Sequence, residues 1–405
     1  MSKEIDVLII GGGPAGAMTG IELRKKGYST CIIDKETFPR PKLCAGLLTQ
    51  KSIDLLAVHC PGLDPSDFVV EQAQTLDFYF QDKKVNSFTI PVKYYLTERT
   101  IFDNLLIQYY LKLGGKLLQQ VALKPGYIDF RKSTITAGSD KITYRYLAGA
   151  DGCNGIVSRA AKIRRHDILC MEGNIPRDLL KEKEFRIYFG LTRIGYGWYF
   201  PKKDHYCVGM GGEGSGQAIS KIARRFFHEV QNRQAEQAGA AMDKERRTDG
   251  CEGLSRETGG AGDSGLKGAF VPSGRRLNTG KLPKNTLLVG DAAGFTEPVT
   301  WEGIYYAMQS GVLAAGAIDA SAKRNKRNVT RRYNKSVRPI RQNIRAARFW
   351  KRILFYPPIL KAFMKHLETH TNFALFYLEK VIATGEISYR NFLWVYFTRV
   401  RKQGT

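Results

Sequence analysis

Three glycines near the N-terminus have the spacing of a phosphate-binding turn. Gly11, Gly13 and Gly16 follow an apolar segment, residues 5–10, and precede a helix-like stretch that stops at Gly27. In such a unit the first glycine permits the tight turn, the second lets the backbone approach a pyrophosphate, and the third allows close helix packing. Free N–H groups at the helix start favour an anion. The predicted phosphate-binding loop comprises Gly11, Gly13, Pro14, Ala15 and Gly16.

An acidic residue follows at the distance that a dinucleotide site needs. The second apolar segment, residues 29–33, ends in Asp34, and Lys35 comes next. An acidic residue at this separation from the glycine loop accepts hydrogen bonds from the adenosine ribose. The first 35 residues therefore predict a strand–helix–strand unit that binds a dinucleotide, with Asp34 and Lys35 on its ribose side.

Two downstream segments resemble motifs of FAD-dependent hydroxylases and reductases. Residues 149–152, GADG, resemble one motif, and residues 290–293, GDAA, resemble another in which the aspartate holds the ribityl chain of FAD. By the same resemblance, Arg99 heads a helix and reaches the flavin-bearing part of the cofactor. The resemblance implies one FAD, and the residues it adds to the cofactor site are Arg99, Asp151, Gly290, Asp291, Pro298, Gly303 and Ile304.

A third segment is similar to a motif of geranylgeranyl reductases, where it lines the cavity for the isoprenoid chain. It is residues 196–202, YGWYFPK. The resemblance implies a substrate wall, although an alternating aromatic strand is also typical of an ordinary sheet core. The substrate-binding residues implied are Tyr196, Trp198, Phe200 and Pro201.

Residues 39–46, PRPKLCAG, also resemble these reductases, in which the cysteine approaches the flavin. Cys44 is therefore a candidate for cofactor binding and for catalysis, while the alternative is a small buried apolar residue. The chain departs from the family at Ala45 and at Trp301, where glycine is usual. We expect Ala45 to lie at the cofactor and Trp301 to narrow the substrate cavity or to stack on the flavin.

The family scaffold supports several reactions. The main hypothesis is an FAD-dependent reductase of carbon–carbon double bonds in an isoprenoid or other long apolar substrate. The alternatives are an FAD-dependent monooxygenase of an aromatic or polyketide-like molecule and a membrane-associated flavoprotein with a role in stress resistance. A halogenase motif is matched only in part, with mismatches at Tyr196 and Phe200. No second glycine-rich nucleotide motif is present, so the electron donor is NAD(P)H, a ferredoxin or a reduced flavin.

These segments require a discontinuous domain arrangement. The fold class predicted is α/β, α+β overall, with a Rossmann-type FAD-binding domain, a mixed-sheet substrate domain and a C-terminal helical region. The FAD-binding domain is assigned to 1–72, 96–162 and 282–325, the substrate domain to 73–95 and 163–281, and the basic helical region to 326–405. Residues 231–268 contain few large apolar groups and predict a mobile excursion or lid, or a disordered insertion.

The composition of the chain limits which binding partners and which cellular compartment we expect. The chain has 405 residues, a formal charge of +25 and seven cysteines without a C-x-x-C pair. This cysteine pattern predicts no disulfide framework and no metal site, and it is typical of a cytoplasmic protein. Apolar runs are too short for a transmembrane helix. The charge excess predicts attraction to an anionic partner.

The C-terminal region has a basic amphipathic pattern. Five arginines recur at steps of three or four residues and therefore share one face of a helix. Apolar residues that include Ile340, Ile344 and Trp350 fall on the other face. Such a helix suits peripheral contact with an anionic membrane at its inner face. The alternative is a helical subdomain that packs its apolar side on the FAD-binding domain and leaves the arginines in water. Nucleic acid is not expected, since no binding motif accompanies the charge. The arginines are Arg338, Arg341, Arg345, Arg348 and Arg352.

Overall fold

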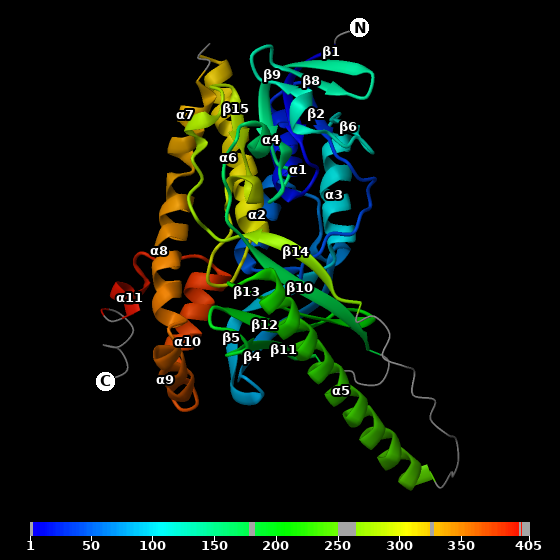
Figure 1. Ribbon diagram of the computed structural model, residues 1–405, viewed down its shortest axis with the longest axis vertical. Coiled ribbons are helices and arrows are strands. Elements are labelled where there is room, and N and C mark those ends of the chain that lie inside the picture. Colours follow the sequence, from blue (N-terminus) through cyan, green and yellow to red (C-terminus); the bar gives the residue numbers. More distant parts are fainter. Residues whose placement is uncertain (1–2, 178–182, 250–264, 325–327, 397, 399–405) are drawn as a thin grey trace.

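The computed structural model describes residues 3–177, 183–249, 265–324, 328–396 and 398, and for residues 237–249 it describes the backbone only. Figure 1 shows two layers, one above the other, with the N-terminal sheet and its helices in the upper layer. A long helix, α8, runs down one flank past both layers. The predicted fold class, a Rossmann-type domain joined to a mixed sheet and a helical C-terminal region, is confirmed.

The upper sheet is mostly parallel, and its central strands are apolar on both faces because helices cover both sides. Its order is β6-β2-β1-β9-β8-β7, with β15 paired to β9. Helix α1 packs against both α3 and α6 beside it. The strands are β1 (Lys3–Ile10), β2 (Thr30–Ile33), β6 (Lys116–Leu118), β7 (Ile128–Asp129), β8 (Thr134–Ala137), β9 (Asp140–Gly149) and β15 (Thr286–Leu288), and the helices are α1 (Pro14–Lys25), α2 (Gln50–His59), α3 (Arg99–Lys112), α4 (Ile156–Ala160) and α6 (Ile304–Ala322).

The lower sheet is mixed, because β11 pairs with β4 in parallel while the other neighbours are antiparallel. Its order is β14-β10-β13-β12-β11-β4-β5-β3. The predicted domain boundaries stay a prediction. The strands are β3 (Leu47–Leu48), β4 (Val69–Phe80), β5 (Lys83–Thr97), β10 (Asp167–Pro176), β11 (Phe185–Phe189), β12 (Gly195–Pro201), β13 (His205–Gly212) and β14 (Lys267–Pro272).

Helix α5 (Gly216–Asp249) covers one face of the lower sheet, and its Phe226 and Phe227 join a core with Tyr199 and Tyr206. The mobile excursion, lid or disordered insertion predicted for residues 231–268 stays a prediction, and its first part, as far as Asp249, is helical because α5 continues to that residue. The segment is rich in Ala, Glu, Gln, Lys and Arg, which favour a helix even where little apolar surface is buried. Residues 250–264, the rest of that prediction before β14, lie outside the described residues.

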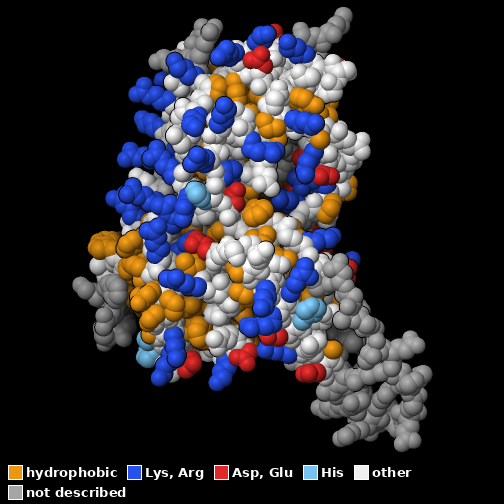
Figure 2. All heavy atoms as spheres, viewed as in Figure 1, with side chains coloured by type: hydrophobic (Ala, Val, Ile, Leu, Met, Phe, Trp, Pro, Cys, Tyr) orange, Lys and Arg blue, Asp and Glu red, His pale blue; other side chains and the backbone are white. Residues whose placement is uncertain are grey.

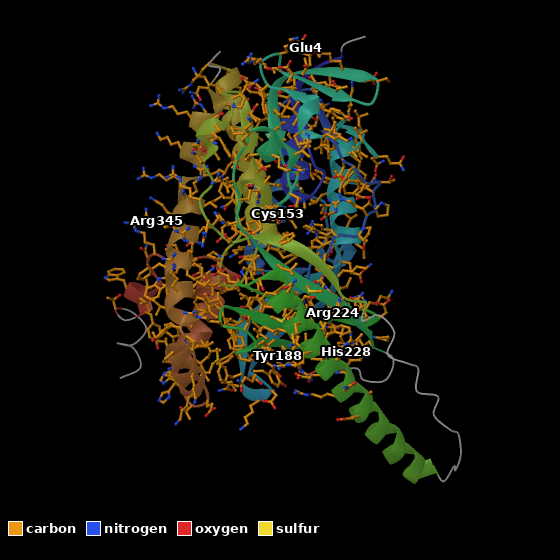
Figure 3. The ribbon with its side chains drawn as sticks, viewed as in Figure 1. Glu4, Cys153, Tyr188, Arg224, His228 and Arg345 are labelled. Atoms are coloured by element: carbon orange, nitrogen blue, oxygen red, sulfur yellow. The ribbon has the colours of Figure 1, made fainter. Side chains whose placement is uncertain are left out.

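Helix α8 (Arg338–Leu354) belongs to both layers. Ile340 and Ile344 lie in the core of the upper layer, whereas Ala347 lies in the core of the lower layer. Arg345 projects away from the protein (Figure 3). The packed alternative therefore holds for the apolar face of α8, but the face reaches the substrate sheet as well as the FAD-binding domain. The other C-terminal helices are α7 (Val329–Ser336), α9 (Pro357–Leu367), α10 (Asn372–Phe376), a π-helix (Tyr377–Ala383) and α11 (Phe392–Val395).

None of the helices in the described ranges combines the length and the apolar character that crossing a membrane requires.

Candidate active site

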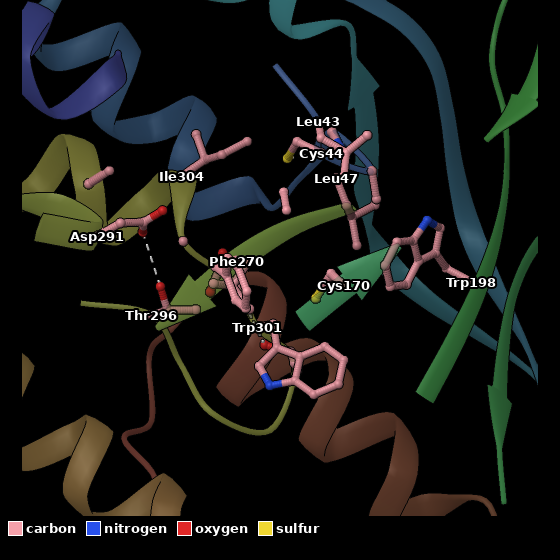
Figure 4. A pocket seen from close by; sticks show the side chains of 18 of the residues that line it. Leu43, Cys44, Leu47, Cys170, Trp198, Phe270, Asp291, Thr296, Trp301 and Ile304 are labelled. Atoms are coloured by element: carbon pink, nitrogen blue, oxygen red, sulfur yellow. Dashed lines mark hydrogen bonds between the residues drawn. The ribbon is translucent and has the colours of Figure 1, made fainter. Parts of the chain in front are cut away.

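A cavity of about 830 Å³ lies where the two layers meet. The glycine loop after β1 and the start of α6 form one part of its wall, and the lower sheet forms another. In Figure 4, Asp291 and Ile304 lie on one side of the cavity, Trp198 on the other, and Cys170 and Trp301 between them. Helices α8 to α11 close the far end with apolar side chains. One continuous space therefore joins a polar end to an apolar end.

The glycine loop has the geometry that its sequence predicts. Gly11 has a φ of +101°, and a Cβ there would lie 2.4 Å from the Ala150 carbonyl oxygen. A Cβ on Gly16 would lie 1.9 Å from the Gly11 oxygen, so α1 packs directly on the turn. Gly11, Gly13, Pro14 and Ala15 line the cavity, whereas Gly16 lies behind them. A side chain at Gly11 or Gly16 would collide with backbone atoms, which cannot move aside as a flexible side chain can.

Asp34 lies beside this loop at the end of β2. Its Oδ2 accepts a hydrogen bond from the Gly12 N–H at 2.7 Å, and both Asp34 and Lys35 line the cavity. The buried guanidinium of Arg40 lies 3.9 Å from Asp34 and 3.3 Å from Asp103. A bare loop with a neighbouring guanidinium suits a pyrophosphate, and the carboxylate suits a ribose. Arg40 was not identified from the sequence, although its segment carries two basic residues before Cys44.

Arg99 begins α3 and lines the cavity. Two of its nitrogens donate to the two carboxylate oxygens of Asp103, each at 2.7 Å, and its side chain also hydrogen-bonds the Cys44 thiol. Burial acts to lower the pKa of Arg99, but the charges and hydrogen bonds of Asp103 and Cys44 together outweigh it and raise the pKa. The guanidinium is therefore a fixed cation between the cofactor loop and Cys44.

Two carboxylates stand at the positions implied for the flavin-bearing part of FAD. Asp151 Oδ2 accepts from the Val157 N–H at 3.0 Å, while Oδ1 is buried without a hydrogen-bond partner. Burial raises the Asp151 pKa to about 6. Asp291 Oδ1 accepts from the Thr296 hydroxyl at 3.1 Å, and both carboxylates line the cavity. A buried carboxylate oxygen without a partner in the cavity wall is suited to accept a hydrogen bond from a hydroxyl group of bound FAD.

Lys202 fixes the loop that carries Cys44 and Ala45. Its Nζ donates to the carbonyl oxygens of Ala45 at 2.7 Å and Thr97 at 2.8 Å, and the residue is only 3% exposed. Burial lowers the Lys202 pKa. Cys44 and Ala45 both face the cavity. The lysine of the YGWYFPK segment thus holds the cysteine segment in place, a role that the sequence did not indicate.

Tyr196 and Trp301 form a stacked pair of rings in the cavity wall. Their ring centroids are 4.7 Å apart with an interplanar angle of 16°. The Tyr196 hydroxyl donates to the Thr300 carbonyl oxygen, which fixes the pair to the loop before α6. Trp301 has a φ of +52°, a conformation that favours glycine. Trp198 and Phe200 also line the cavity.

The structure separates the sequence-derived residues into wall and support. Most of them line the cavity, including Gly303 and Ile304. The residues behind the wall are Gly16, Pro201, Gly290 and Pro298. Gly290 instead donates its N–H to Ser310 Oγ at 2.8 Å, and Pro298 packs on Gly274. Sequence reasoning missed Glu172, whose signal was a lone acid in an apolar strand, and it missed the wall formed by α8 to α11.

Comparisons with known proteins agree with this geometry. Residues 4–59 match the FAD binding domain family. The chain is 30% identical over 351 residues to an uncharacterized protein of Methanosarcina barkeri, covering 83% of this chain and 80% of that one. It is 28% identical to a digeranylgeranylglycerophospholipid reductase of Methanosphaera stadtmanae, covering 80% and 79%. The structure resembles that of a geranylgeranyl bacteriochlorophyll reductase-like protein from Thermoplasma acidophilum, with a TM-score of 0.73, 18% identity and coverage of 100% and 99%.

Proposed function

Because this chain belongs to the geranylgeranyl reductase family of FAD-dependent oxidoreductases, we propose that it reduces carbon–carbon double bonds in the isoprenoid chain of a lipid. One observation carries the proposal: a single cavity runs from the glycine loop and Asp291 to the apolar side chains of α8 to α11. A long apolar chain that must meet a flavin needs this shape. The name of the Methanosphaera relative supports the substrate class.

The chain's own residues prepare the reaction in three ways. Gly11, Gly13 and Arg40 would hold the pyrophosphate of FAD, and Asp291 would hold its ribityl chain. Bound FAD, once reduced, supplies the hydride. The stacked Tyr196 and Trp301 would orient the alkene at the flavin end, while the apolar wall excludes water from the reacting carbons.

Anaerobic stopped-flow spectroscopy tests this function. The reduced holoprotein is mixed with a digeranylgeranylglycerophospholipid in detergent micelles, and we expect oxidation of the flavin together with a mass gain of two hydrogens per bond reduced. The matched control is the fully saturated lipid, which should leave the flavin reduced. A hydroperoxyflavin that forms only with an aromatic substrate and oxygen would instead support the monooxygenase alternative.

The electron donor is a separate proposal. We infer that reducing equivalents come from NAD(P)H bound transiently, from a ferredoxin or from a reduced flavin, because the sequence contains no second glycine-rich nucleotide motif. Anaerobic reduction rates with each of the three donors decide among them. A donor that reduces the flavin at least as fast as steady-state turnover with that donor is kinetically competent, and a donor that reduces it more slowly than turnover is excluded.

Peripheral contact with an anionic membrane is supported by one face of the C-terminal region. Phe349 and Trp394 are 59% and 64% exposed, and Tyr356 and Ile359 of the same C-terminal region are also exposed. Figure 2 shows a column of basic side chains on the same flank, leading down into an apolar patch. Arg345, Arg348 and Arg352 belong to α8, which enters this patch. Aromatic side chains next to arginines suit the interface of an anionic bilayer.

The apolar patch is also connected to the cavity. Ile359 is exposed on the outside and lines the cavity, and Trp350 and Leu393 line it close to Phe349 and Trp394 in sequence. A lipid chain could therefore pass from the bilayer to the flavin without crossing water. This path avoids the cost of exposing apolar chain, about 25 cal/mol per Å².

Sedimentation with vesicles tests the membrane contact. Binding to vesicles rich in phosphatidylglycerol should exceed binding to pure phosphatidylcholine, and each of R345Q and R352Q should weaken it by about 1 kcal/mol. The double variant F349S/W394S should also bind weakly. Val58→Ser is the control, since Val58 is 72% exposed on α2 in another element. Equal loss in the control would contradict a specific membrane face.

A further inference from the structure

Glu172 is a carboxyl group in the wall of the flavin end of the cavity. It lies on β10 and is 8% exposed. One carboxyl oxygen, Oε1, accepts a hydrogen bond from the Cys44 N–H at 2.7 Å, and the Cys207 thiol lies 3.6 Å from Oε2. Cys170, two residues earlier on β10, also lines the cavity. Glu172 is thus held beside the cysteine segment that faces the cofactor site.

The neighbouring strand packs closely against Glu172 and the aromatic wall. A Cβ on Gly209 would lie 2.6 Å from the Glu172 Cβ and 2.6 Å from Trp198 Cζ2. A Cβ on Gly211 would lie 2.5 Å from Cys170 Sγ and 2.7 Å from the Trp301 ring. These two glycines let β13 pack closely between the acid and the aromatic wall, which holds Glu172 in place beside the cavity.

The charged groups that face Glu172 are already engaged by other partners. Lys202 donates to two carbonyl oxygens, and Arg99 is paired with Asp103. Within the described part of the chain, no cation lies within 4.0 Å of the Glu172 carboxyl group. The remaining neighbours are the thiols of Cys44, Cys170 and Cys207. Burial raises the pKa of Glu172 more than the hydrogen bonds from Cys44 and Cys207 and the charges of Lys202 and Arg99 lower it.

Three other acidic groups in the cavity wall, Cys170, Tyr196 and Glu302, are less suited to give up a proton. Burial raises the pKa of the Cys170 thiol, and the Tyr196 hydroxyl is committed to the Thr300 carbonyl oxygen. Glu302 is ion-paired with Lys51 at 2.6 Å. A carboxyl group whose pKa is raised by burial is a better proton donor near neutral pH than one in water.

We propose that Glu172 is the general acid of alkene reduction. The step rests on the proposed function: the hydride from reduced FAD forms a C–H bond at one alkene carbon, the π bond breaks, and its electron pair takes the proton of Glu172 at the other carbon. The product is the alkane unit, the oxidised flavin and the Glu172 carboxylate. Water then returns the proton to the carboxylate. The Cys44 N–H positions the acid and stabilises the carboxylate that forms.

The test compares the holoprotein with its E172Q variant in two half-reactions. Glutamine keeps the shape and accepts from the Cys44 N–H but cannot donate the proton. We expect FAD affinity and reduction by dithionite to stay within about twofold. Oxidation of the reduced flavin by the digeranylgeranylglycerophospholipid should slow by about 100-fold or more. The wild-type rate should fall as pH rises through the Glu172 pKa, and this limb should be absent in E172Q. Glu229→Gln, on the exposed face of α5, is the matched control.

A second readout does not depend on turnover. Infrared difference spectra of the wild-type holoprotein between low and high pH should contain a protonated carboxyl band that E172Q lacks, and Glu172→Asp should retain both a band and a pH limb. Equal oxidation rates in wild type and E172Q would overturn the proton-donor role alone. A wild-type flavin that the lipid does not oxidise would overturn the proposed function as well, while the infrared band would still report the protonation of Glu172.

Discussion

Trp301 gives a test of backbone strain that separates the side chain from the main chain. Its φ of +52° lies in the left-handed region, and its indole stacks on Tyr196. We expect Trp301→Gly and Trp301→Ala to lose the same indole but to differ in the backbone. Glycine adopts this φ freely, whereas alanine keeps the crowding of its Cβ against the backbone.

The sizes of the two effects follow from the structure. Removing a half-buried indole and its stacking contact costs about 2 kcal/mol in the free energy of unfolding. Strain in the left-handed region costs a non-glycine residue about 1–2 kcal/mol. The glycine variant should therefore be more stable than the alanine variant by about 1 kcal/mol. This order is the reverse of that expected in a helix, where alanine is the more stable residue.

Urea unfolding at saturating FAD measures the difference. Both variants should unfold at lower urea than the wild type, and Trp301→Ala should unfold first. Flavin absorbance and tryptophan fluorescence together show whether the two layers unfold in one transition. If the two variants had equal midpoints, or if alanine were the more stable, the positive φ would not be a source of strain and the argument about Trp301 would fail.

Three further changes test other parts of the site. Gly16→Ala puts a Cβ at 1.9 Å from the Gly11 oxygen, so FAD affinity, measured by fluorescence titration, should fall at least tenfold, and unchanged affinity would contradict the loop geometry. Lys51→Met leaves Glu302 as an unpaired buried carboxylate and should cost about 3 kcal/mol in urea unfolding, with recovery in the double variant K51M/E302Q. The raised Asp151 pKa of about 6 means that the folded state binds this proton more tightly than the unfolded state. Its effect is therefore a loss of stability as pH rises from about 4 to about 6. Asp151→Asn should remove that loss in the cofactor-free protein, and an unchanged pH profile would argue against the shift.

The cofactor half of the site could be predicted because its signals are local. The glycine loop specifies its own turn, so Gly11 and Gly16 already fixed the approach of α1 to β1 in the sequence. Asp34 follows from the strand that precedes it. These features depend on a few consecutive residues and on backbone sterics, which are the same in any protein of this fold.

The rest of the cavity depends on contacts between distant segments. The apolar stripe of α8 predicted that something must cover it, but periodicity does not identify the partner, and the stripe turned out to bridge two cores. Glu172 gave a weak signal, since one acid in an apolar strand is typical of an edge or a surface turn as much as of a site. The role of Lys202 in holding the Cys44 segment could not be predicted, because its partners are the backbone carbonyl groups of residues 45 and 97.

The double membership of α8 has a mechanical consequence. A rigid rod anchored by Ile344 in one layer and by Ala347 in the next fixes the distance between them, because a helix resists stretching and bends little over one turn. The two layers therefore cannot part like a hinge to admit a ligand while α8 stays folded. Ile359 on α9 and Leu393 on α11 line the apolar end of the cavity, so a ligand that enters there can leave α8 and both cores in place.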